Sequence, residues 1–255
     1  MASPRPLIPL TLRRSLALLA VGGSLFAATS PACAHYLWLE PQGQGARLYF
    51  GEVNEVREQS PGRLDEIPQP RVWSVPAAAA GAGEHRAARL PGAFRVDAAV
   101  GPNLVAMESG YAVQDWTRLG LGVVKPVFYA RLSAWPVSAV VPAAPELRLD
   151  VQPVPGAGGV RVLFDGKPLA GAQVAVHAPN GWDQEHKADA EGHVRLALPW
   201  RGQYVLEVVH REPAAGEFQG RRFEAVRHRA TLTIVRADGI DPAGTGSLAP
   251  RHPEH

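Results

Sequence analysis

The sequence predicts an all-β protein made of two β-sandwich-like lobes. It contains 26 glycines and 24 prolines in 255 residues, and this density leaves little room for long helices. No stretch shows apolar residues at the i, i+3, i+4 and i+7 spacing of an amphipathic helix. Short runs rich in Val, Leu, Phe and Tyr recur instead, separated by turn residues, and this pattern is typical of an all-β sandwich.

Residues 1–34 have the three parts of a secretory signal peptide. Arginines precede a mostly apolar run over residues 16–28, and the small residues of 32–34 then form a cleavage site. The apolar run is shorter than the roughly 20 residues that span a bilayer, and no second such run follows. We therefore expect cleavage after Ala34, no transmembrane segment in the mature chain, and a periplasmic or secreted location. Lipid attachment through Cys33 is the alternative for the same stretch.

Removing this signal changes the net charge and the cysteine count. The whole chain has 26 basic and 24 acidic residues, and the signal holds three arginines and no acid, so the mature chain has 23 against 24, a net charge of −1. This balance does not indicate binding to nucleic acid or to anionic membranes. Cys33 is the one cysteine in the sequence, so the mature chain has no thiolate for disulfides, metal ligation or nucleophilic catalysis.

The predicted strands fall into two groups. For an N-terminal β-rich lobe, residues 35–145, we expect strands at 36–39, 46–50, 71–75, 93–98, 103–108 and 126–134. For a second lobe, residues 146–237, we expect strands at 159–164, 173–177, 193–198, 204–210 and 229–235. Four prolines within 142–155 mark the boundary between the lobes. We expect a polar loop at 54–69, a flexible tip at 76–83 and a disordered tail at 238–255.

Several stretches of the chain resemble the DUF4198 family. The opening of the expected mature chain is similar to the opening of these proteins: HYLWLEP at 35–41, then LYFGE at 48–52. Three later stretches resemble the second half of these proteins: VRVLFDGKPLAGAQVAV at 160–176, DAEG at 189–192 and GQYVLEVVH at 202–210. The resemblance implies a periplasmic protein of a kind linked to nickel and cobalt uptake. It also implies that the second lobe is a transthyretin-like sandwich of the carboxypeptidase-regulatory type.

His35 is the first candidate for a metal ligand, because cleavage after Ala34 would make it the N-terminal residue. Such a histidine offers its α-amine and Nδ1 to one ion, and a second imidazole would complete a copper-type histidine brace. Nitrogen ligands of this kind suit Cu, Ni, Co or Zn. We consider Glu40 and Glu52 as carboxylate neighbours, although Glu40 fits a surface charge equally well. The plain alternative is that a first-position histidine has no role in metal binding.

Strand alternation selects two partners for His35 among the other histidines. His210 shares the inward face of the strand at 204–210. His228 directly precedes the strand at 229–235 and shares a face with Ala230, Leu232 and Ile234, which also points inward. The alternative for each of these histidines is a structural role, as a core residue hydrogen-bonded to the backbone. The remaining histidines within the lobes are predicted to point outward or to lie in polar loops: His85, His177, His186 and His193.

These observations predict an exported transition-metal-binding protein, and we favour a non-enzymatic role. We expect His35, His210 and His228 to bind divalent Ni, Co or Cu, and the resemblance implies delivery of the ion to a membrane metal-uptake transporter. No G-x-S-x-G elbow, phosphate-binding G-x-x-x-x-G-K-[ST] loop or H-E-x-x-H helix occurs in the sequence. Two alternatives stay open: a copper histidine-brace oxidoreductase, and a structural or binding module without metal.

Overall fold

The structure is a computed structural model that describes residues 35–75, 83–97, 103–156 and 158–242. The predicted signal peptide, its cleavage site, nearly all of the predicted tip and most of the predicted tail lie outside these residues. The described chain is all-β, as predicted, and its helical segments are two short 3-10 turns, η2 (Arg63–Glu66) and η3 (Thr117–Leu119). Neither of these is long and apolar enough to cross a membrane.

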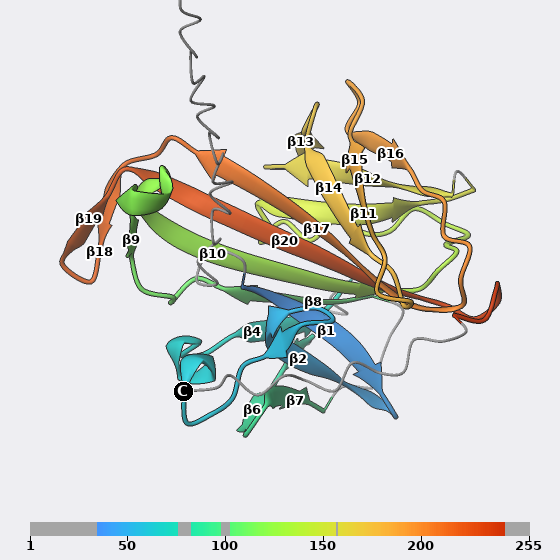
Figure 1. Cartoon of the computed structure of the whole chain (residues 1–255), viewed down its shortest axis with the longest axis horizontal. Coiled ribbons are helices and arrows are strands. Elements are labelled where there is room, and N and C mark those ends of the chain that lie inside the picture. The colour runs from blue at the N-terminus through green and yellow to red at the C-terminus, as the bar shows by residue number, and fades with distance from the viewer. Residues whose placement is uncertain (1–34, 76–82, 98–102, 157, 243–255) are drawn as a thin grey trace, which may run out of the picture. The chain divides into compact units, whose positions relative to one another are not determined.

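A nine-stranded sheet is the central element of the fold (Figure 1). Its order is β15 (Asp183–Lys187), β14 (Gln173–His177), β17 (Gly202–Glu212), β20 (Ala225–Arg236), β10 (Gly122–Ser133), β8 (Asn103–Glu108), β4 (Arg71–Ser74) and β5 (Glu84–His85), while β9 (Gln114–Trp116) pairs with β10. The pair of β10 and β20 is parallel, and the other pairs of this sheet are antiparallel. This parallel pair joins a strand from before residue 145 to one from after residue 146.

Smaller sheets complete the fold. The five-stranded sheet has the order β1 (Tyr36–Gln42), β2 (Gly45–Glu52), β7 (Ala93–Val96) and β6 (Ala87–Leu90), with β3 (Val56–Arg57) on β2. The four-stranded sheet contains β11 (Leu149–Val154), β12 (Gly159–Phe164), β13 (Lys167–Pro168) and β16 (His193–Arg195). The strands β18 (Gly216–Phe218) and β19 (Arg221–Phe223) form a separate hairpin.

Each face of the nine-stranded sheet has its own apolar core, because neighbouring residues of a strand point to opposite faces. On β10, Phe128 packs in a core with β1 and β2, whereas Tyr129 packs in a core with β11 and β12. The first core is drawn from residues 37–132, and the second mainly from residues 144–234. The chain thus changes core near the predicted lobe boundary, while the nine-stranded sheet continues across it.

Three segments differ from the prediction. The proline-flanked stretch expected at the boundary contains β11, whose apolar side chains reach the second core. His186, which was expected in a polar loop at 183–186, lies instead in the edge strand β15, whose backbone pairs with β14 on one side. The expected loop at 54–69 contains β3 and η2. A strand at a sheet edge can carry polar residues on both faces, so periodicity alone did not indicate β15.

Gly51 allows β3 to approach the end of β2 closely, and we expect the stability of the fold to depend on this contact. A Cβ at this position would lie 2.1 Å from the carbonyl oxygen of Val56, at a φ of +139°. Gly51→Ala should therefore lower the free energy of unfolding by about 1–3 kcal/mol more than Gly43→Ala does. Gly43 is a matched control because it also has positive φ, +56°, but open space around its Cβ position. Equal losses in urea unfolding would contradict the close-contact explanation.

Candidate functional site

His35 lies directly before β1 and is held at its backbone by the neighbouring strand β20. Its side chain is buried, and the whole residue is 4% exposed. Arg229 Nη1 donates to the His35 carbonyl oxygen at 3.1 Å, and Thr231 Oγ1 donates to the Leu37 carbonyl at 2.8 Å. These bonds satisfy carbonyls on the edge of β1, so the position of residue 35 is set by side chains nearly 200 positions later in the chain.

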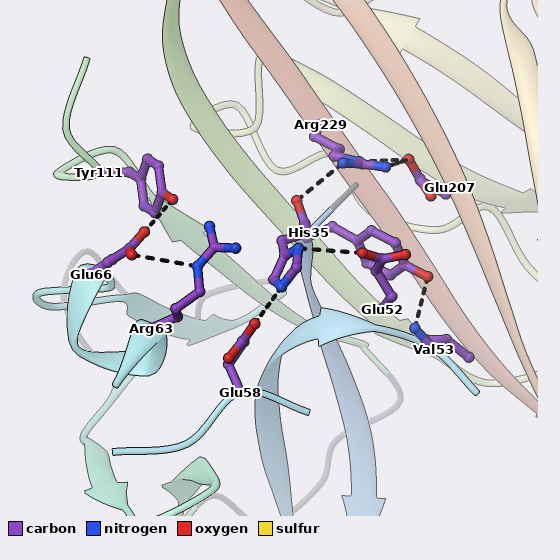
Figure 2. A network of polar contacts seen from close by, with 10 residues as sticks. His35, Glu52, Val53, Glu58, Arg63, Glu66, Tyr111, Glu207 and Arg229 are labelled. Carbon is purple, nitrogen blue, oxygen red and sulfur yellow. Dashed lines mark hydrogen bonds and ion pairs between the residues drawn. The ribbon is translucent and has the colours of Figure 1, made fainter. Parts of the chain in front are cut away.

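The two ring nitrogens of His35 each face a carboxylate (Figure 2). Nδ1 lies 3.3 Å from Glu52 Oε1, and Nε2 contacts Glu58 Oε1 closely. Burial by itself lowers the pKa of His35, but the hydrogen bonds to Glu52 and Glu58 outweigh it and leave this pKa above the ordinary value. The imidazole is therefore both buried and fixed in orientation.

Tyr36 connects this site to the body of the nine-stranded sheet. Its hydroxyl accepts a hydrogen bond from the backbone N–H of Val53 at 2.9 Å and lies 3.3 Å from His177 Nε2. Because Val53 follows Glu52 directly, the first bond also restrains the carboxylate that faces His35. Tyr36 is 3% exposed, and burial raises its pKa far above the ordinary range, so its hydroxyl stays protonated.

A buried ion pair lies behind the backbone of His35. Arg229 contacts Glu207 Oε1 at 2.5 Å through Nε and Nη2, and the two residues are 6% and 9% exposed. Glu207 also lies 3.7 Å from His177, which contacts Asp183 at 2.9 Å. His177 has the outward register predicted for it, but its ring is covered on that face because Tyr36 of β1 stacks on it.

A second polar group lies on the Glu58 side of the ring. Figure 2 shows Arg63 and Glu66 from η2 beside Tyr111, whose hydroxyl donates to Glu66 at close range. Arg63 Nε lies 3.4 Å from Glu66 Oε1. The charge of Arg63 acts against a proton on His35, so the two acidic groups around His35 are partly balanced by a cation.

The structure brings His210 and His228 together, but not to His35. The two are direct partners across β17 and β20, with ring centroids 6.3 Å apart. They have the inward register expected from strand alternation, on the face that carries Tyr129. The next residue, Arg229, points to the other face and reaches His35. His35 and the two histidines therefore lie on opposite faces of the nine-stranded sheet, and this sheet separates the expected ligands.

The carboxylates around His35 were only partly foreseen. Glu52 was one of the two considered from the sequence, and it does face the ring. Glu40 instead accepts hydrogen bonds from Trp38, Arg57 and Gln203. Glu58 was missed because it lies in the segment interpreted as a polar loop. The only sequence signal for Glu58 was its position shortly after β2. Because β2 runs antiparallel to β1, the end of β2 lies beside the start of β1.

The chemistry of the donors fits an ion bound on the Nδ1 side of His35. Among the described residues, no group of three or more His, Cys, Asp and Glu side chains is arranged to hold a metal. Two side chains do meet there, the Nδ1 of His35 and a Glu52 oxygen, and residue 35 would add its own α-amine if the chain begins at this position. Glu58, which contacts Nε2, would then act as the carboxylate that orients a metal-bound histidine.

The comparisons with known proteins give one match. Residues 156–212 match the family model of DUF4198, a domain of unknown function. This confirms the resemblance to DUF4198 for the segment from β12 to β17. His210 lies within the DUF4198 match, whereas His35, Glu52 and Glu58 lie outside it. The comparison with curated proteins and the comparison with solved structures found no match.

Proposed function

We propose that this protein is an exported protein that binds a divalent transition-metal ion at His35. The observation that carries the proposal is the buried imidazole whose Nδ1 faces Glu52 while Glu58 holds Nε2. The ion would be held by Nδ1, by the α-amine of a chain beginning at His35, and by Glu52. Two nitrogens and one carboxylate oxygen form a set suited to Ni, Co or Cu(II).

The ion is cargo in this proposal, and the protein hands it to a membrane metal-uptake transporter. This part rests on the resemblance to DUF4198 and on the predicted signal peptide. The buried position of His35 favours binding over turnover, because catalysis at a metal requires access for a substrate. His210 and His228 have no part in the proposed site.

Calorimetric titration with Ni, Co and Cu(II) tests the proposal. Protein that begins at His35 should bind at least one of these ions, and retaining Ala34 or introducing Glu52→Gln should each weaken binding at least tenfold. Glu40→Gln is the matched control, because Glu40 lies on β1 and its carboxylate accepts hydrogen bonds from Arg57 and Gln203 instead. Affinity should fall as the pH is lowered, with the fall beginning above pH 6.5, because the pKa of His35 is raised and the ion must displace its proton.

The outcomes separate the alternatives. Equal affinity with and without Ala34 would contradict the N-terminal site, and no binding of any of the three ions would favour a structural module. Copper-dependent oxidation of a substrate in the presence of a reductant would favour the oxidoreductase. A loss of affinity in His210→Gln with none in Glu52→Gln would restore the pairing of His35 with His210 that was expected from the sequence.

A further inference from the structure

His210 and His228 belong to a cluster that the proposed metal site does not use. Tyr129 Oη lies 2.9 Å from His228 Nδ1, and Glu212 Oε2 lies 3.0 Å from His228 Nε2. The rings of His210 and His228 stack at an interplanar angle of 26°. These four residues come from β10, β17 and β20, so the cluster joins three neighbouring strands of the nine-stranded sheet.

The four-stranded sheet is attached to this cluster at one end. The ring centroid of Phe164, the last residue of β12, lies 4.4 Å from that of His210 and 5.1 Å from that of His228. Arg148, directly before β11, donates to Glu212 at 2.7 and 2.9 Å and to Asp165 at 2.7 Å. Aromatic and ionic contacts therefore hold the same end of the β11–β12 pair against the nine-stranded sheet.

A proton on either imidazole would act against these contacts. His228 is 1% exposed, and burial lowers its pKa despite the hydrogen bond to Glu212. Burial also lowers the pKa of the half-buried His210. The charged and titratable groups that face the pair come from three sides: Tyr129 from β10, Glu212 from β17, and Arg148 and Asp165 from the ends of β11 and β12.

We propose that this cluster is an acid-sensitive clasp, which holds the end of β12 on the nine-stranded sheet at neutral pH and releases it in mild acid. One proton puts a charge into a buried position, and two protons put a pair of cations side by side near Arg148. An unfolded histidine takes up its proton near pH 6.5, whereas the folded pair does so only at lower pH. The clasp is therefore intact above pH 6.5 and loses stability as the pH falls below this value.

The stability contributed by two other histidines has the opposite pH dependence, so the stability of the clasp has to be measured at its own strands. The hydrogen bonds to carboxylates outweigh burial and raise the pKa of both His35 and His177. Their contribution to stability is present below pH 6.5 and is lost as the pH rises through the raised values. The free energy of global unfolding sums both kinds of histidine, whereas hydrogen exchange resolves single strands.

Hydrogen exchange at pH 7.5 and pH 5.5, corrected for intrinsic rates, tests the clasp on the full chain. Peptides that cover β11 and β12 should lose at least tenfold protection in acid, while those from β4 and β8 should not. His228→Gln should respond at least threefold less to the pH change, because its side chain cannot take up the proton. His193→Gln is the matched control, an exposed histidine of the four-stranded sheet, and it should respond like the wild type.

Each other outcome would overturn the clasp. These are full protection of β12 at pH 5.5, a loss spread evenly over all sheets, and an unchanged response in His228→Gln. If His228→Gln does not fold, His210→Gln decides, because its half-buried ring has no hydrogen bond to another described residue that would be lost. An unchanged response of β12 in that variant would contradict the proposal, and a response at least threefold weaker would support it.

Discussion

Asp150→Ala should lower the free energy of unfolding by about 3–5 kcal/mol. Asp150 and Arg131 are 4% and 0% exposed, and they form a bidentate pair between β11 and β10, with N–O distances of 2.9 and 2.6 Å. Removing the carboxylate leaves a guanidinium in an apolar core. Arg131 Nη1 already has no hydrogen-bond partner among the described residues, so the loss of Asp150 leaves this cation far from satisfied.

Urea unfolding followed by tryptophan fluorescence measures this loss. Asp241→Ala is the control, because Asp241 pairs with Arg201 at the surface, where both side chains are more than half exposed, and should cost at most about 1 kcal/mol. The double variant Arg131→Met/Asp150→Leu should recover much of the stability, since apolar residues can replace a buried ion pair. Losses of similar size for Asp150→Ala and Asp241→Ala would refute the argument.

Arg229→Met should also cost about 3–5 kcal/mol, because it leaves Glu207 buried without its cation. It also removes the hydrogen bond to the His35 carbonyl, so the start of β1 should lose protection from hydrogen exchange more than β8 does. Arg227→Met, the same substitution two residues earlier on β20, is the matched control, since Arg227 is more exposed and its guanidinium lies over Trp116.

Urea unfolding and exchange at β1 should distinguish these two variants. If Arg227→Met destabilised the protein as much as Arg229→Met, the effect would belong to β20 in general. If β1 kept its protection in Arg229→Met, the hydrogen bond to residue 35 would not be what holds the strand. His177 should partly compensate for the lost cation, because it already lies 3.7 Å from Glu207.

The fold class could be predicted because it depends on local signals. The β-rich runs and the frequent glycines and prolines predicted an all-β chain, and most of the longer strands lie within a few residues of their expected positions. Alternation within a strand also placed His210 and His228 on one face. The family resemblance is confirmed for residues 156–212, which contain the stretches at 160–176, 189–192 and 202–210.

The candidate site could be predicted only in part. His35 and Glu52 were named from the sequence, whereas Glu58, Arg229 and Glu207 were not connected to them. Glu207 points to the face that the sequence marks as outward, and such a face is normally solvated. In this fold β1 and β2 cover it, so a charge pair is buried there.

What the sequence by itself determined is the fold class, most of the longer strands and the face on which their residues point, because these follow from neighbours in the chain. Only the tertiary structure decided which faces are covered and which residues meet. The parallel pairing of β10 with β20 and the packing of β1 over β20 placed His35 on one side of the nine-stranded sheet, and His210 and His228 on the other. Contacts between segments far apart in sequence leave no periodic signal in either segment, so the acidic partners of His35 could be identified only from the tertiary structure.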